Sequence, residues 1–126
     1  MNRIIITAIG ADKPGLVDQI SSIINDNDGN IENSKMIKIE NQFAMIIDFH
    51  SSKDLDTIKT NLQHIEELEI TYKLAEISKE NNKTNYYIIT GADNQGIINK
   101  VSNFFSKRNI NIVEVNTYIE SAPTTG

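Results

Sequence analysis

An internal repeat without gaps constrains the fold more than any other feature of the sequence. A shift of 81 positions places residues 9–17 over residues 90–98, and both copies read Gly-Ala-Asp-x-x-Gly followed by two aliphatic residues. The match continues in register until Asn30-Ile31 lies over Asn111-Ile112. Self-similarity at a fixed spacing indicates repeated structural units. We therefore expect two related units in this chain.

Both copies open with a pattern typical of a strand followed by a helix. The β-branched or aromatic runs Arg3–Ile9 and Asn85–Thr90 end at a glycine, which predicts mostly buried strands. In each copy the apolar residues that follow stand 0, 1, 4, 7 and 8 positions from the first of them, which places them on one face of a helix. Pro14 is expected in the first turn of its helix, where a missing N–H is tolerated. These faces comprise Leu16, Val17, Ile20, Ile23 and Ile24, and then Ile97, Ile98, Val101, Phe104 and Phe105.

The first copy continues with two more strands, a second helix and a last strand. Residues 31–39 and 42–49 read as strands joined at Glu40-Asn41, and Ser52 is a plausible cap for the second helix. The order β-α-β-β-α-β predicts an α+β fold, a ferredoxin-like sandwich of one antiparallel sheet and two helices. The apolar face of the second helix is expected to hold Leu55, Ile58, Leu62, Ile65 and Leu68, and the last strand Ile70, Tyr72 and Leu74.

The composition between and after the copies predicts the domain organisation. Residues 78–84 include no apolar side chain and read as a linker. We expect a first domain over residues 1–77 and an incomplete second copy, β-α-β, over residues 85–126. Half of a sandwich leaves its helix poorly covered, so we expect the chain to continue beyond residue 126. Packing of the half unit on the first domain or on another subunit is the alternative.

Composition also excludes several functional classes. The 126 residues contain no cysteine, so disulfides, thiolate metal sites and thiol nucleophiles are absent. The net charge is −5 and the chain has no basic cluster, which argues against binding to nucleic-acid phosphates. The apolar runs are much shorter than the roughly 18 residues of a membrane span. We expect a cytoplasmic protein that does not bind membranes.

The sequence contains no convincing catalytic or metal-binding constellation. His50 and His64 have no carboxylate at a spacing that makes either a ligand or a base. The oxygen-rich run 25–29 lacks the glutamate that closes a calcium loop. We predict no catalytic residue, no metal and no cofactor, and therefore a protein that is not an enzyme.

The turn from the first strand into its helix has the chemistry of a receptor for a zwitterion. Backbone N–H groups of Gly15, Leu16 and Val17 are expected to be unpaired at the positive end of the helix dipole, where a carboxylate binds. Asp12 could accept hydrogen bonds from an ammonium group. Two structural interpretations stay open, because Asp12 is equally suited to an Asx-turn or a helix cap, and Asn30 to a turn before a strand.

The motif in residues 10–16, followed by Asn30-Ile31 and the run 43–47, resembles the ACT domain family of amino-acid-sensing regulatory modules. The tandem arrangement is most similar to the glycine cleavage system transcriptional repressor group. The resemblance implies a homodimer that binds a small amino acid, glycine or serine, and controls a protein partner such as a transcription factor. The ligand-binding residues it implies are Asp12, Pro14, Gly15, Leu16, Asn30 and Ile31, with Asn30 facing a ligand across a subunit boundary. The second-copy equivalents are Asp93, Gly96, Ile97 and Asn111, although Asn94-Gln95 stand where a proline is expected.

Two other functions remain open from the sequence. Similar modules occur at the amino ends of formyltetrahydrofolate deformylase and phosphoserine phosphatase, so this chain could be the sensory part of a longer enzyme. It could also be an oligomerisation module without a ligand.

Overall fold

A computed structural model of the chain describes residues 2–76, 83–91 and 96–118. The chain divides into two compact units, Met1–Glu80 and Asn81–Gly126, which are described separately. The predicted linker lies mostly outside the described residues. The helices in the described part of the chain fall short of the length and hydrophobicity that a membrane span requires.

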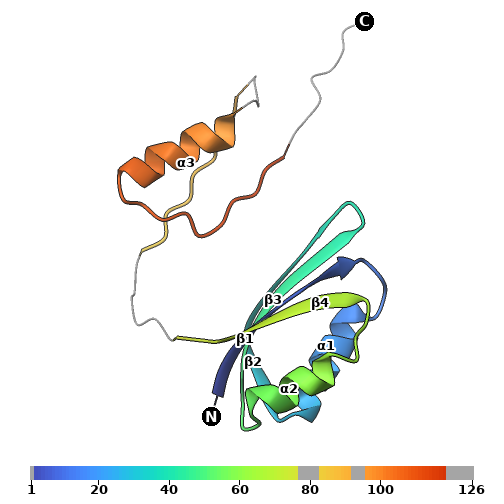
Figure 1. Ribbon diagram of the computed structural model, residues 1–126. Coiled ribbons are helices and arrows are strands. Elements are labelled where there is room, and N and C mark those ends of the chain that lie inside the picture. Colours follow the sequence, from blue (N-terminus) through green and yellow to red (C-terminus); the bar gives the residue numbers. More distant parts are fainter. Residues whose placement is uncertain (1, 77–82, 92–95, 119–126) are drawn as a thin grey trace, which may run out of the picture. The chain divides into compact units, whose positions relative to one another are not determined.

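The first unit is a four-stranded antiparallel sheet with two helices on one face (Figure 1). The strands follow the order β2-β3-β1-β4, so both central strands are flanked by antiparallel neighbours. This arrangement confirms the ferredoxin-like fold. Its elements are β1 (Asn2–Ala11), α1 (Leu16–Asp26), β2 (Gly29–Ile39), β3 (Gln42–Ser51), α2 (Leu55–Leu62) and β4 (Leu68–Leu74).

A single apolar core lies between the sheet and the two helices. Alternate residues of β1 and β3 point toward α1 and α2, because successive side chains of a strand face opposite sides of the sheet. Removing each of these large side chains from water contributes about 1.5–3 kcal/mol. The fully buried members of this core include Ile4, Ile6, Ile20, Ile24, Ile47, Phe49, Ile58 and Leu62.

The β2–β3 hairpin has the register that the sequence predicts. Ile39 pairs with Gln42 across the two-residue turn at Glu40-Asn41, and Glu40 adopts a positive φ of 54°. A bulge follows, since Ile31 pairs with Phe49 and Asn33 with Asp48, which leaves Glu32 as the extra residue. Because of this extra residue, the side chains on either side of Glu32 face opposite sides of the sheet.

Both helices of the first unit begin at residues other than those predicted. Gly15 is the N-cap of α1, so Pro14 precedes the cap instead of occupying the first turn. The cap of α2 is Asp54, whose side chain accepts a hydrogen bond from the backbone N–H of Thr57. Ser52 was the wrong cap because it lies two residues too early to reach the first free N–H groups.

The second helix is also shorter than its apolar spacing predicts. α2 ends at Leu62, and Ile65 follows in the turn that leads to β4. Leu68 is the first residue of β4, paired with Gly10. Both side chains are buried, so their spacing correctly marks core positions but not a helix.

A buried polar network fastens the end of α1 to the rest of the first unit. Asn27 is 7% exposed, and its side-chain Nδ2 donates to the carbonyl of Ile23 at 2.7 Å. Asn61 on α2 donates to the Oδ1 of Asn27 at 2.7 Å, and the hydroxyl of Ser51 donates to the Asn27 carbonyl at 2.6 Å. The side chain and the backbone carbonyl of Asn27 therefore join three elements, and both polar ends of the side chain have partners.

The second unit retains the helix of the repeat. Helix α3 (Ile97–Lys107) starts after Gly96, whose φ of 78° resembles the φ of 92° at Gly15. The ring of Tyr87 lies 5.2 Å from that of Phe105, so the segment before the helix contacts its apolar face. Residues 83–91 and 110–118, which correspond to the predicted flanking strands, are not assigned as strands. Strand structure requires a hydrogen-bonded neighbour, and hydrophobic pattern alone does not supply one.

Candidate functional site

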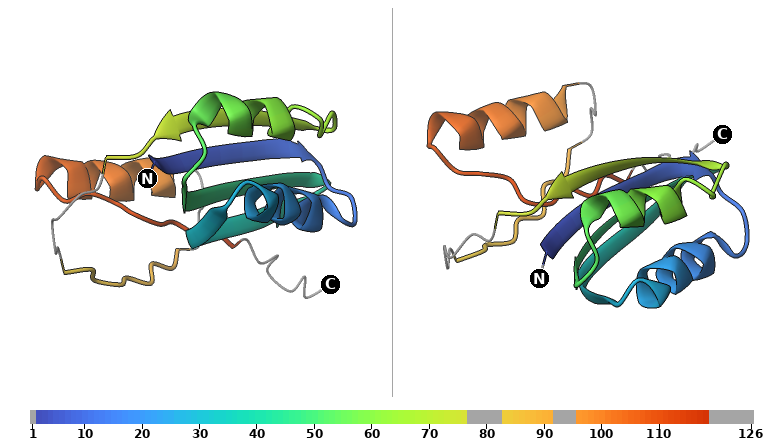
Figure 2. Two further views of the ribbon diagram at one scale, coloured as in Figure 1. Left: turned by 90° about the horizontal axis from the view of Figure 1, so that it is seen from below. Right: turned by 60° about the horizontal axis from the view of Figure 1, so that its bottom comes forward.

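The candidate site begins at the loop between β1 and α1, near the turn of the β2–β3 hairpin (Figure 2). The backbone N–H of Asp12 donates to the carbonyl of Asn41 at 2.8 Å, which ties this loop to the hairpin. Gly15 then turns the chain into α1 with a left-handed conformation. A β-carbon at Gly15 would meet no atom within 4 Å, so the cap faces open space.

The first N–H groups of α1 are available for a ligand. In the part of the chain that the structure describes, no hydrogen bond of good geometry engages the N–H of Gly15, Leu16 or Val17. No side chain caps the helix, so the interpretation of Asp12 as its cap is wrong. Free N–H groups at the positive end of a helix favour a negatively charged ligand group.

A hollow of about 380 Å³ adjoins these N–H groups. The apolar side chains of Leu16 and Phe43, which are nearly fully buried, form the floor of the hollow. Charged side chains lie around its rim. The residues around it are Asp12, Lys13, Pro14, Gly15, Leu16, Val17, Asp18, Met36, Lys38 and Phe43. The hollow therefore brings together the four residues predicted from the first motif.

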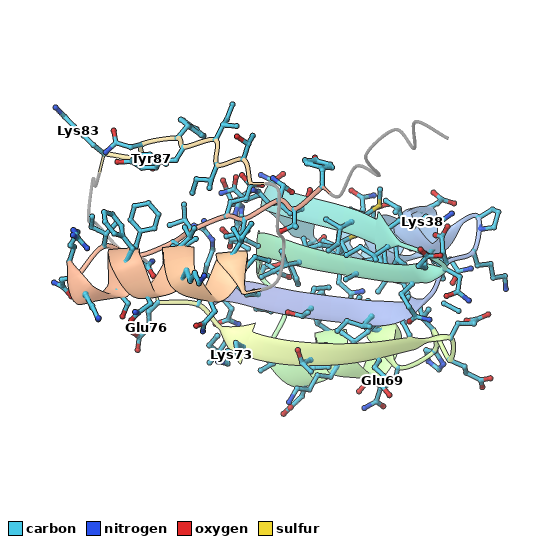
Figure 3. The ribbon with its side chains drawn as sticks, turned by 90° about the horizontal axis from the view of Figure 1, so that it is seen from above. Lys38, Glu69, Lys73, Glu76, Lys83 and Tyr87 are labelled. Carbon is cyan, nitrogen blue, oxygen red and sulfur yellow. The ribbon has the colours of Figure 1, made fainter. Side chains whose placement is uncertain are left out.

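Two ion pairs hold the rim of this hollow. Nζ of Lys38 lies 3.1 Å from Oδ2 of Asp12, and Nζ of Lys13 lies 3.0 Å from Oε1 of Glu67. A hydrogen bond from its own backbone N–H, followed by the contact with Lys13, lowers the pKa of Glu67. Lys38 is at the end of β2 beside the hairpin turn, where Figure 3 labels it. A ligand ammonium group at Asp12 would therefore have to displace or share with Lys38.

Asn30 and Ile31 do not reach this hollow within one chain. They line a second hollow of about 410 Å³ together with residues of α1 and Gly29. Asn30 pairs with His50, whereas Phe43 pairs with Gly10, so the two hollows lie toward opposite ends of the sheet. The 11 residues of α1 correspond to a helix of about 16 Å between them.

The second-copy residues are only partly placed. Asp93 lies outside the described residues. Gly96 caps α3 without a side-chain hydrogen bond, as Gly15 does for α1, while Ile97 is half-buried and Asn111 is exposed. The two copies therefore share the backbone geometry of the cap.

Sequence reasoning missed the β2 and β3 side of the hollow. Met36 and Lys38 were not singled out, and Phe43 was predicted only as a core residue. The available signal was the hairpin turn at Glu40-Asn41. Pairing outward from that turn places residues 38 and 43 at the same end of the sheet as Gly10.

A family model described as ACT domain matches residues 2–75, the part of the chain that holds the sheet, both helices and the larger part of the site. The chain belongs to the ACT domain family. Among curated relatives, a UPF0237 protein of Methanocaldococcus jannaschii is 35% identical over 66 residues, and the match spans 50% of this chain and 73% of that protein. A UPF0237 protein of Methanopyrus kandleri is 40% identical over 47 residues, 37% of this chain, and the match spans about half (52%) of its length.

Solved structures share the fold of this ACT domain protein. An unknown protein from Galdieria sulphuraria matches 99% of this chain and 75% of its own at a TM-score of 0.80 and 24% identity. A protein assigned as a glycine cleavage system transcriptional repressor matches 86% of this chain and 67% of its own, with a TM-score of 0.64 and 20% identity. A formyltetrahydrofolate deformylase of Burkholderia mallei matches 59% of this chain but 28% of its own, with a TM-score of 0.55 and 11% identity.

Proposed function

We propose that this ACT domain protein is a non-enzymatic regulatory module that binds a small free amino acid. The observation that carries the proposal is the hollow beside the uncapped start of α1. Free N–H groups of Gly15, Leu16 and Val17 would receive the ligand carboxylate, and Asp12 would receive its ammonium group. The resemblance to amino-acid-sensing modules points to glycine or serine.

The second part of the site would come from another copy of the chain. β2 is an edge strand of the sheet and is exposed along most of its length. Edge strands offer unpaired backbone groups to a second chain. Pairing of two copies through β2 would allow Asn30 and Ile31 of one copy to close the hollow of the other, so that the ligand favours one arrangement of the modules. A cytoplasmic protein partner, such as a transcription factor, would respond to that arrangement.

The experiment is thermal denaturation of the full chain with each of the twenty amino acids. We expect one or two small amino acids to raise the melting temperature, because a ligand that binds only the folded state stabilises it. Asp12→Ala should lose this response, whereas Asp26→Ala, which removes an exposed carboxylate at the far end of α1, should keep it. An equal response from the Asp12 variant would contradict the ammonium contact.

Lys38 provides a sharper arm of the same experiment. Because Lys38 competes for the carboxylate of Asp12 at 3.1 Å, Lys38→Met should strengthen binding of the ligand several-fold. Weaker binding in this variant would assign Lys38 to the ligand carboxylate and remove Asp12 from its proposed role.

Two alternatives have their own tests. The match to the formyltetrahydrofolate deformylase covers 28% of that enzyme. The alternative that this chain is the sensory part of a longer enzyme is tested by asking whether its reading frame continues into a catalytic domain. An oligomerisation module without a ligand would give no thermal shift with any amino acid, even well above millimolar concentrations.

A further inference from the structure

Met36 is an apolar side chain on the helix-covered face of the sheet that the helices leave largely exposed. It pairs with Met45 across β2 and β3, and residues directly opposite each other share one face of a sheet. Both helices lie on that face (Figure 2). Met45 is nevertheless 7% exposed, whereas Met36 is 55% exposed. Met36 therefore lies at the margin of the core, where its apolar surface still faces water.

The hollow beside the start of α1 joins Met36 to other apolar side chains. Leu16 and Phe43 are the buried floor, and Pro14 and Val17 belong to the segment that leads into α1. Val17 is 39% exposed, so this wall, like Met36, keeps apolar surface in contact with water. Ligand pockets combine apolar walls of this kind with a few polar groups that fix the orientation of the ligand.

The proposed function assigns the two charged ends of a zwitterion and leaves the side chain of the ligand unassigned. The carboxylate would bind the free N–H groups of α1 and the ammonium group would bind Asp12. The remaining substituent of the ligand α-carbon then lies in the rest of the hollow. Glycine has no such substituent, so it would leave the apolar walls wet. The volume of about 380 Å³ falls within the range of about 300–1,000 Å³ that is typical of ligand pockets.

We propose that the hollow binds an amino acid with a branched aliphatic side chain, and that Met36 and Phe43 contact this side chain. The inference rests on the proposed function, and it departs from the glycine or serine to which the resemblance points. An aliphatic group in the hollow removes its own surface and that of Met36 from water, which favours binding. A serine hydroxyl placed against the same wall would lose hydrogen bonds to water.

Titration calorimetry of the full chain with L-valine, L-threonine and glycine tests the assignment. L-valine and L-threonine have nearly the same shape, and a hydroxyl in L-threonine replaces one methyl group of L-valine. We expect L-valine to bind roughly 10- to 100-fold more tightly than L-threonine, and also more tightly than glycine. Binding of L-threonine or glycine that equals or exceeds that of L-valine would overturn the aliphatic assignment and leave the proposed function in place. Failure of every amino acid to bind would overturn the proposed function, and this inference with it.

Met36→Gln tests the wall itself, because glutamine keeps the length of the side chain and makes its end polar. The variant should bind L-valine more weakly by on the order of tenfold, while its affinity for glycine stays nearly unchanged. Ile37→Gln is the matched control, because Ile37 is the next residue of β2, is also 55% exposed and pairs with Ala44 on the opposite face of the sheet. The control should bind L-valine as the wild type does. Equal losses in the two variants, or a loss for glycine as large as that for L-valine, would overturn the contact with Met36.

Discussion

Gly15 and Gly96 stand 81 residues apart and take the same left-handed cap conformation, with φ values of 92° and 78°. Each begins a helix that no side chain caps. The shared geometry explains why glycine occurs at this position in both copies, since other residues are strained at positive φ. At Gly15 the same conformation also leaves the start of α1 open toward the hollow.

Gly15→Ala should destabilise the first unit by about 1 kcal/mol, the strain of a left-handed alanine. The added β-carbon meets no neighbour, so no clash contributes. Gly15→Asn should cost less, because asparagine tolerates this conformation better. Urea unfolding of both variants measures the difference. A larger loss for the asparagine variant would show that space at the cap, and not backbone strain, selects glycine.

Asp48→Asn should lower the melting temperature at neutral pH by a few degrees. Arg3 donates from Nε and from a terminal nitrogen to the two oxygens of Asp48, at 2.5 and 2.7 Å. The hydrogen bond with Arg3 lowers the pKa of Asp48. The pair therefore stabilises the fold above the ordinary aspartate pKa of about 3.9, and this contribution is lost as pH falls through the lower folded-state value.

Melting curves of the wild type and the Asp48 variant across acidic pH check this dependence. Their difference should be constant near neutral pH and should shrink in strong acid. Asp26→Asn should follow the wild type throughout, because the carboxylate of Asp26 is exposed. A difference that grows on acidification would contradict the sign of the prediction.

Asn27→Ala should cost about 1–3 kcal/mol of unfolding free energy, because it removes two partly buried side-chain hydrogen bonds and leaves one amide without its partner. The partners are the carbonyl of Ile23 and the amide of Asn61. Asn25→Ala, an exposed asparagine two residues away, is the matched control and should change stability far less. Chemical denaturation compares the two, and equal losses would mean that the network adds little.

Asp54→Ala should lower the melting temperature by a few degrees, because it removes the cap of α2. The hydrogen bonds from Thr57 lower the pKa of Asp54, so the cap also weakens in acid as that carboxylate is protonated. Ser52→Ala should have a smaller effect, since the Ser52 hydroxyl makes one exposed contact with Asp28. Calorimetry of the two variants would contradict this assignment if Ser52 were the more sensitive position.

The repeat and the apolar periodicity were sufficient to predict the order of elements in the first unit. They could not locate the ends of α2, because Ile65 and Leu68 keep a helix-like spacing while lying in a turn and at the start of a strand. Spacing reports which side chains are buried, and a turn followed by a strand buries them equally well. The same limit applies to residues 85–90, where a strand-like pattern lacks the neighbour that a ladder requires.

The candidate site was predictable where it is local in sequence. Residues 12–16 form one continuous motif, and their chemistry follows from a strand that turns into a helix. Lys38 could not be assigned from that motif, because its contact with Asp12 depends on how the hairpin returns beside β1. The separation of Asn30 from the hollow likewise follows from the length of α1 and from strand register.

The bulge at Glu32 affects the tendency of this chain to aggregate at high protein concentration. A long, flat outer strand is a template on which identical chains can stack into fibrils. The extra residue interrupts the regular ladder between Ile31 and Asn33, and Oε1 of Glu32 is held 2.7 Å from Nδ1 of His50. The interrupted ladder and the contact between Glu32 and His50 therefore limit how regularly identical chains can stack along β2.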